Sequence, residues 1–342
     1  MLMYFSYILK KFFKNFLIIF FSISFLYSVV DVMFSVSNMP PSSNLFILYF
    51  FYMFIYAGVT LYPLSIIFAF LLTLNQMIKF NELVSFYSLG FMPKKILKPF
   101  ILSTLILILT MFALQSTKAA YSGEYAEAIK NAKKLSTTNM FLKYKNRIIF
   151  IKSLNPIIKT AHEMKVFIIK NNKVTKIYYA KEAKFRNDKW YCKNTDIMTL
   201  SKSQWQKKNK SFYFLQNFKP KIISNLQKLK NISFYDAYLT IKYFKNIDKN
   251  TILSILFFKI FTPLSILALM IFLFIKAPIH IRISNVPLFM LKSLSLSILV
   301  WGGMLLAFKF AKQGVLPYWV LVLPFVVLVI IDFIILRRDN EL

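Results

Sequence analysis

Apolar residues fall in six long runs, and each run is long enough to cross a membrane as a helix. A spanning helix needs roughly 20 mostly apolar residues. The six runs cover about residues 12–30, 45–74, 99–116, 251–275, 287–308 and 316–336. A long and more polar stretch separates the third run from the fourth. The pattern therefore predicts three membrane spans, an inserted domain and three further spans.

The inserted stretch consists of short segments in which apolar and polar residues alternate. These segments are NRIIFIKSL (146–154), KVFIIKNNKVTKIYYA (165–180), AKFRNDKWYCKNTDIMTL (183–200) and KSFYFLQNF (210–218). Alternation with a period of two, interrupted by N-N and N-D turns, is typical of antiparallel strands. A helix is expected before them in TKAAYSGEYAEAIKNAKK, where it could continue the third span. We therefore predict a small β-sandwich or open barrel in this region.

Together these elements predict a membrane α-helical protein with an inserted all-β domain. Residues 1–118 are expected to hold the first three transmembrane helices, and residues 251–342 the last three. The β-domain is expected at residues 119–250, between the two groups of three helices.

Basic residues flank the spans unevenly, which predicts how the chain crosses the membrane. Short cytoplasmic loops carry an excess of Lys and Arg. Four flanks place their basic residues on one side: Lys10, Lys11 and Lys14; Lys79, Lys94, Lys95 and Lys98; Lys276 and Arg282; Arg337 and Arg338. Lys309 and Lys312 are the exception and fall on the other side. Both termini are therefore predicted to be cytoplasmic, and residues 119–250 to lie outside the cytoplasm.

The net charge of +31 is concentrated in the inserted domain, because more than half of it lies between residues 117 and 250. A strongly basic domain attracts phosphorylated lipid headgroups, nucleic acid or an anionic membrane surface. The whole chain is also rich in Lys, Asn, Ile and Phe, so a bias in composition alone would produce the same excess. The charge is compatible with both interpretations and does not identify a partner.

Residue patterns for catalysis and for nucleotide or metal binding are absent from the sequence. No G-x-x-x-x-G-K-[ST] loop occurs. His162 and His280 fall on opposite sides of the membrane in the predicted topology, so they cannot share a metal site or a catalytic triad. The spans hold no pair of carboxylates for a proton relay, and Asp332 is expected to pair with Lys292. We predict no catalytic residue, no metal and no cofactor, and therefore not an enzyme.

The segment NELVSFYSLGFMPKKILKP (81–99), between the second and third runs, predicts a short cytoplasmic helix at about 81–91. Glu82 suits its first turn, where the helix dipole favours a carboxylate. Gly90 is placed for a C-terminal cap, and Pro93 prevents the helix from continuing.

This short helix has two different faces. At helical spacing, Asn81, Ser85 and Ser88 lie on one side, and the other side carries Leu83, Phe86, Tyr87 and Gly90. A helix this short is not stable alone, so it needs a surface on which to dock. Anionic lipid would suit the lysines that follow it, whereas the carboxylate of Glu82 favours a protein groove. A short cytoplasmic helix between spans is how a permease receives force from a separate ATPase.

Four segments carry a resemblance to a known family. They are NELVSFYSLGFMPKKIL, the preceding LYPLSIIFAFLLTLNQM, YYAKEAKFRNDKWYCKNTDIM in the inserted domain, and KIFTPLSILALMIF in the fourth span. In this order, and with the three-plus-three layout, the chain resembles the LptF/LptG family, the permease subunits of the lipopolysaccharide exporter of Gram-negative bacteria. The last segment is slightly more similar to the LptG branch than to the LptF branch.

The resemblance implies a role for the short helix and a set of partners. Glu82 matches the family's coupling-helix carboxylate, which contacts the ATPase, and Gly90 matches its glycine. With Leu83, Phe86 and Tyr87 they form the expected coupling site. The implied partners are a homologous permease, a cytoplasmic ATPase dimer (LptB-like), a periplasmic bridge protein (LptC/LptA-like) and lipopolysaccharide, without nucleic acid. The implied location is the bacterial inner membrane, with a jellyroll-like β-domain in the periplasm.

The sequence departs from the family in the outer half of the first span. Family members often carry basic residues there that meet substrate phosphates, whereas this chain has Tyr27, Ser28 and Asp31. Three lysines are candidates to replace them in lipid binding: Lys259, Lys309 and Lys312. Lys259 lies well inside the fourth run, where a charge is costly and tends to be functional unless its stem reaches back to the interface.

Three other functions remain open on the sequence alone. The chain would also fit a permease of another ATP-driven exporter, for lipoproteins or peptides. It would fit a membrane-anchored scaffold whose outer domain binds a ligand without transport. An enzyme acting on lipid is the least supported, because no acid, base or metal-ligand group is evident.

Overall fold

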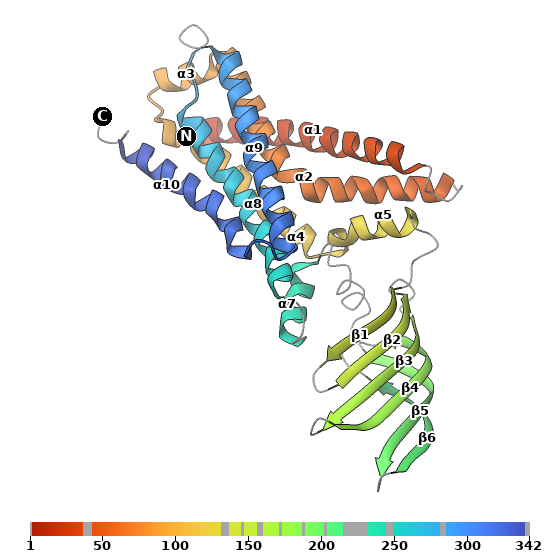
Figure 1. Ribbon diagram of the computed structural model, residues 1–342. Helices are drawn as coiled ribbons and strands as arrows, with labels where there is room; N and C mark the ends of the chain where they lie inside the picture. Colours follow the sequence, from red (N-terminus) through yellow and green to blue (C-terminus); the bar gives the residue numbers. More distant parts are fainter. Residues whose placement is uncertain are drawn as a thin grey trace. The chain divides into compact units, whose positions relative to one another are not determined.

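The computed structural model describes most of the chain, which divides into two compact units (Figure 1). The described residues are 2–36, 43–130, 137–144, 147–155, 160–170, 173–186, 189–201, 204–214, 232–243, 249–280 and 285–338. One unit comprises Met1–Ser37, Ser42–Ala126 and Asn250–Leu342, and the other comprises Asn38–Pro41 and Glu127–Lys249. The first is helical, and the second contains the sheet, so each is described by itself.

The helical unit contains six helices that are long and apolar enough to cross a membrane, which confirms the predicted fold class. They are α1 (Leu2–Ser35), α2 (Ser43–Lys79), α4 (Pro93–Gln115), α8 (Lys249–Ile275), α9 (Val286–Lys312) and α10 (Leu323–Arg338), the last preceded by the 3₁₀ turn η3 (Tyr318–Val322). The short helix α3 (Glu82–Ser88) joins α2 to α4. The three-plus-three layout follows directly from the six apolar runs.

Helix α1 is longer than the apolar run that predicts it. Its 34 residues span about 51 Å, whereas the hydrocarbon core of a membrane is about 30 Å thick. The excess lies mainly at the N-terminal end, where Lys10, Lys11 and Lys14 interrupt the apolar pattern without interrupting the helix. The apolar pattern used to predict the span ends near these lysines, whereas the α-helix continues past them.

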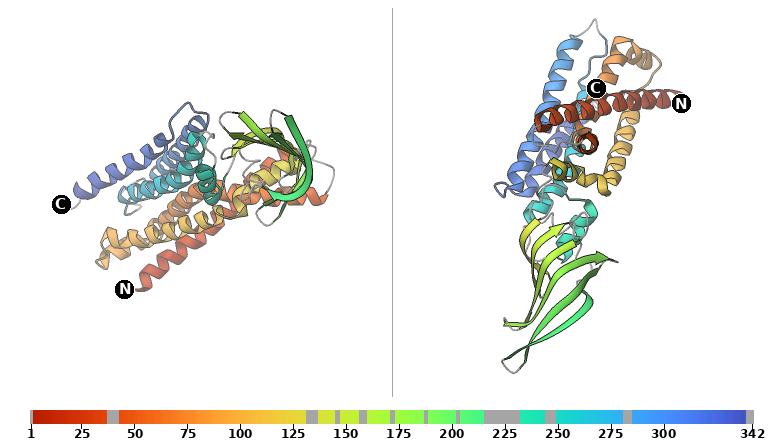
Figure 2. Two further views of the ribbon diagram at one scale, coloured as in Figure 1. Left: turned by 90° about the horizontal axis from the view of Figure 1, so that it is seen from below. Right: turned by 90° about the vertical axis from the view of Figure 1, so that its right-hand side faces the viewer.

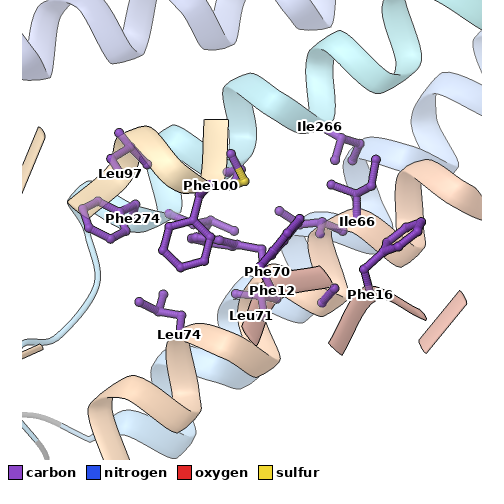
Figure 3. Close-up of a cluster of buried hydrophobic side chains, with 14 of the residues drawn as sticks. Phe12, Phe16, Ile66, Phe70, Leu71, Leu74, Leu97, Phe100, Ile266 and Phe274 are labelled. Carbon is purple, nitrogen blue, oxygen red and sulfur yellow. The ribbon is translucent and has the colours of Figure 1, made fainter. Parts of the chain in front are cut away.

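Aromatic packing joins four of the long helices at the centre of the bundle. Phe100 of α4 makes edge-on contacts with Phe12 of α1 and Phe70 of α2, with ring centroids 5.8 and 5.3 Å apart. It also lies 6.2 Å from the ring of Phe274 in α8 (Figure 3). Lipid tails are as apolar as these side chains, so close packing rather than exclusion of water holds such a core together.

A polar contact is buried near the same core and ties α1 to α2. The amide nitrogen of Asn15 donates to the hydroxyl of Thr73 over 2.8 Å and to the side-chain oxygen of Gln76 over 3.1 Å. Hydrogen bonds of this kind between membrane helices contribute about 0.6 kcal/mol on average. Gly58 lets the two helices approach, because a Cβ there would meet the ring of Phe20 at 2.8 Å.

The helix expected after the third span forms, but it does not continue that span. Helix α4 ends at Gln115, and it is followed by the 3₁₀ turn η2 (Lys118–Tyr121) and by α5 (Ser122–Lys130). The break occurs at Thr117, whose backbone is extended and whose hydroxyl accepts a hydrogen bond from the backbone N–H of Ala119. A local cap of this type competes with helix continuation.

The second unit contains a curved antiparallel sheet of six strands in sequential order (Figure 2). The strands are β1 (Thr137–Tyr144), β2 (Arg147–Asn155), β3 (Thr160–Lys170), β4 (Lys173–Arg186), β5 (Lys189–Ser201) and β6 (Gln204–Phe214). All five turns between the strands fall outside the described residues, including the expected N-N turn at residues 171–172 and the expected N-D turn at residues 187–188. The unit also contains α7 (Phe234–Tyr243), which the sequence reading did not predict.

One face of the sheet is buried and the other is partly open, as the alternating pattern predicts. In register, Ile151 of β2 lies opposite Met164 of β3, which lies opposite Ala180 of β4. All three are buried, together with Ile149, Leu154, Ala161, Val166, Ala183, Trp190 and Cys192. A strand places successive side chains on opposite faces, so this row of alternate residues forms one apolar surface.

The orientation of the β-domain can be tested by thiol labelling of the full-length protein in cells with a permeabilised outer membrane. Lys181→Cys, at an exposed position of β4, should react with an impermeant maleimide. The native Cys192 should not, because it is buried and burial raises the pKa of its thiol to about 11. Ser88→Cys, exposed on α3, serves as the opposite control and should react only after the inner membrane is ruptured. Labelling of Lys181→Cys only after rupture would contradict the predicted topology.

Candidate functional site

Helix α3 is short, and local backbone conformation and hydrogen bonds define both of its ends. A turn at Phe80 and Asn81 separates it from α2, and Asn81 adopts a left-handed conformation with φ of 59°. At the other end, the N–H of Gly90 donates to the carbonyl of Tyr87 over 2.9 Å, and that of Phe91 donates to the carbonyl of Phe86 over 3.0 Å. This pair of bonds is the Schellman motif, and it requires the φ of 77° that Gly90 adopts.

The apolar face of α3 is packed on the protein's own core. The side chain of Leu83 is 1% exposed and belongs to the central cluster of the helical unit. Phe86 and Tyr87 are partly buried against the same cluster, and burial raises the pKa of the Tyr87 hydroxyl. Three of the five expected coupling residues therefore face inward, where they anchor the helix.

The polar face of α3 points away from that core. Asn81, Ser85 and Ser88 are exposed, as the helical spacing predicts. Large apolar side chains are also exposed at both ends of the helix: Phe80 before it, and Leu89 and Met92 after it. We refer to Phe80, Leu89 and Met92 as the α3 rim. Large apolar side chains that are exposed close together mark a candidate site for contact with another protein or with the membrane.

Glu82 is held by α1. Its Oε1 lies 2.5 Å from the Nζ of Lys11 and accepts a hydrogen bond from the hydroxyl of Tyr7 over 3.0 Å. The side chains of Lys11 and Glu82 are 17% and 21% exposed, so the ion pair is largely shielded from water. The other carboxylate oxygen of Glu82 is buried and has no hydrogen-bond partner among the residues that the structure describes. Sequence reasoning missed this contact, because it interpreted Lys11 only as one of the basic residues that flank the first span.

The three candidate lysines for lipid binding lie on two helices whose ends are joined. The side-chain amide of Asn250 in α8 donates to the carbonyl of Ala311 in α9 over 3.3 Å, close to Lys312. Lys309 is exposed and Lys312 is half-buried in the last turn of α9, whose dipole favours positive charge. Lys259 is half-buried further along α8, and Glu124 of α5 is near enough to act on it electrostatically.

The C-terminal half of α1 offers hydrogen-bond acceptors instead of positive charge. The hydroxyl of Tyr49 in α2 donates to Asp31 over 2.5 Å and lies 3.2 Å from the hydroxyl of Ser35. Ser28 donates to the carbonyl of Ser24 in its own helix. Asp31 thus contributes to the contact between α1 and α2, which explains its place in an apolar span without a substrate.

The expected pair between Asp332 and Lys292 does not form in the part of the chain that the structure describes. Asp332 is buried in α10, where its Oδ1 has no hydrogen-bond partner, whereas Lys292 is exposed on α9. The prediction was wrong because similar depth in the membrane does not place two side chains on facing sides of their helices.

Residues that could hold a metal ion do not gather anywhere in the described ranges. Six spans in two groups of three, a β-domain between the groups and a docked helix between the second and third spans define a polytopic membrane permease. The family model for the lipopolysaccharide export system permease LptF/LptG matches residues 6–338, and the chain belongs to this family. No curated protein matches the chain.

Family membership confirms the resemblance seen in the sequence. The chain is a multi-pass protein of the inner membrane and a component of a lipopolysaccharide transport system, which works with partner proteins. It is a transporter component and not itself an enzyme. The matched description covers both branches, so the preference for the LptG branch stays a prediction.

The cap at Gly90 can be tested with a single methyl group. Gly90→Ala should weaken the end of α3 by about 1–2 kcal/mol, because an L-residue is strained at this φ. Hydrogen exchange of the α3 amides should then be about 5- to 30-fold faster. Gly302→Ala is the matched control, since it lies in α9 with nothing near the added Cβ and no unusual φ. Unchanged exchange in α3 would show that the cap does not stabilise the helix.

Proposed function

We propose that the chain is one permease subunit of an ATP-driven lipopolysaccharide exporter. It would extract lipid from the outer leaflet of the inner membrane and pass it to a periplasmic bridge of β-domains. The observation that supports this most directly is the docking of α3 on the transmembrane core through Leu83. A helix fixed in this way can transmit a push to the spans, whereas a freely hinged helix would absorb it.

A cytoplasmic ATPase dimer would supply the push. Its binding surface would be the exposed side of α3, which carries Asn81, Ser85 and Ser88, together with the α3 rim. In this arrangement the buried face of α3 transmits force to the core through Leu83, Phe86 and Tyr87, and these residues do not contact the partner. Gly90 terminates the helix. The contribution of Glu82 depends on its contact with α1.

A second, homologous permease would complete the lipid cavity. Helices α1, α9 and α10 expose much of their apolar surface, whereas α2 is mostly buried within the unit. The acyl chains and the second permease would therefore meet α1 and α9 more than α2. ATP-driven closure of the ATPase dimer would shift the paired bundles between two states and expel the lipid.

Positive charge for the lipid phosphates would come from Lys259, Lys309 and Lys312. Lys309 and Lys312 lie at the end of α9 that also meets the start of α8, and α8 carries Lys259. The acceptor-rich outer half of α1, with Asp31, would not bind a phosphate. These lysines are the positive charges that the sequence offers in place of the family's basic residues in span one.

The β-domain would receive the lipid and contact the bridge protein. Its buried sheet face is lined by branched and aromatic side chains, and the long acyl chains of the lipid are chemically similar to that lining. Its basic composition suits the phosphates of the same lipid.

Reversing the charge of Glu82 tests the coupling role. Glu82→Lys should leave membrane insertion intact and reduce lipopolysaccharide export by at least about tenfold, because it removes a shielded ion pair and places two cations together. Export would be measured as lipid released from spheroplasts or proteoliposomes of the purified complex. Glu182→Lys is the control, since it makes the same chemical change in an exposed pair with Lys184. Normal export and normal ATPase association in Glu82→Lys would count against the proposal.

A further inference from the structure

The N-terminal turns of α1 contact α3 along one side. Tyr4, Tyr7 and Lys11 are spaced three and four residues apart, so they lie on one face of α1. The ring of Tyr4 lies 4.5 Å from that of Phe91 and 6.3 Å from that of Phe86, measured between centroids. Contacts from α1 thus reach the far end of α3 as well as its first residue.

Polar contacts fix the near end of α3 to the same face. Lys11 and Tyr7 both meet Oε1 of Glu82, and the ammonium of Lys11 also lies 5.5 Å from the centroid of the Tyr7 ring. We call Tyr7, Lys11 and Glu82 the α1–α3 clasp. A charge-assisted hydrogen bond shielded from water is stronger and more directional than one at an open surface.

One helical turn further along, α1 is also fixed to α2. Asn15 follows Lys11 by four residues and makes its two hydrogen bonds to Thr73 and Gln76. Helix α2 leads into α3 through the two residues Phe80 and Asn81. The start of α1, the end of α2 and the first residue of α3 are therefore linked by polar contacts on both sides of the turn at Phe80 and Asn81.

We propose that Lys11, assisted by Tyr7, is a positioning residue that locks α3 and the start of α1 into one rigid body. A force applied to α3 then reaches the first span directly, without first bending the turn at Asn81. This inference rests on the proposed function, in which a partner ATPase pushes α3. It assigns the role of Glu82 to a contact within the chain.

The geometry of Glu82 favours this role over direct contact with the partner. Its Oε1 is engaged by two groups of α1, and its Oε2 is buried. A cation of the partner could reach the carboxylate only by displacing the clasp. The exposed residues of α3 are available to the partner without that cost.

A charge swap distinguishes the two roles of Glu82. Lys11→Glu and Glu82→Lys should each reduce lipopolysaccharide export by the purified complex about tenfold, the effect expected for one charge-assisted hydrogen bond. The double variant, which restores opposite charges, should recover most of the export, and Lys11→Arg should retain it. Lys10→Glu is the control, because Lys10 is an exposed neighbour on the same turn of α1. If the double variant is no better than Glu82→Lys alone, the clasp is not the reason that Glu82 matters.

A distance measurement tests rigidity in the same complex. One spin label would be placed on Lys10→Cys, which is exposed, and the other on Val84→Cys, a half-buried position of α3 that is not assigned to the proposed partner surface, both in a Cys192→Ser background. Their distance distribution should be the same in the nucleotide-free and vanadate-trapped states, and it should broaden in Lys11→Met. A distance that changes between the two states of the otherwise unaltered chain would overturn the proposal.

The two experiments separate failure of the clasp from failure of the proposed function. Broadening by Lys11→Met is measured without nucleotide, so it reports the clasp even if no ATPase acts on α3. Absence of ATPase from the purified chain would refute the proposed function and leave that measurement intact. An unchanged distribution in Lys11→Met would refute the clasp and leave the ATPase assignment standing.

Discussion

A helix of seven residues is not stable alone in water, and the contacts that α3 makes with the rest of the helical unit follow from that constraint. Helix α3 is stabilised by burial of Leu83, by the cap at Gly90 and by the ion pair of Glu82 with Lys11. Leu83 anchors the inner side of the helix, the cap stabilises its C-terminal end, and the ion pair holds its first residue. What remains exposed is a polar strip bounded by apolar side chains, so the residues that anchor α3 and the residues that stay exposed lie on different faces of the helix.

The membrane helices also differ from one another in how much of their surface is buried. Helix α2 has a larger buried share than the other five long helices, and its polar residues Thr73 and Gln76 are hydrogen-bonded to Asn15 inside the bundle. Helices α9 and α10 expose apolar side chains over most of their length, as suits contact with lipid or with another permease. Asp332 of α10 differs from these residues, because its buried Oδ1 has no hydrogen-bond partner in the described part of the chain.

Much of the fold could be predicted because it depends on patterns within single segments. The spans follow from apolar runs, the sheet from alternation around residues such as Ile149 and Ile151, and the end of α3 from Gly90. Helix α7 was missed although Ser233 and Asp236 form a capping signal, since the N–H of Asp236 does donate to Ser233 over 3.1 Å. That signal precedes a segment rich in aromatic residues, which was read as part of the β-domain.

The contacts that matter most for the site join segments that are distant in sequence, and no local pattern predicts them. Lys11 and Glu82 are 71 residues apart, and each has a sufficient local explanation, as an interfacial cation and as the first residue of a helix. Asp31 and Tyr49 form a similar case at the other end of α1. In both places a carboxylate that could be mistaken for a ligand-binding group is engaged by a neighbouring helix. Helix α1 therefore uses charged and polar groups at both ends to keep its position, and its apolar middle stays available to lipid.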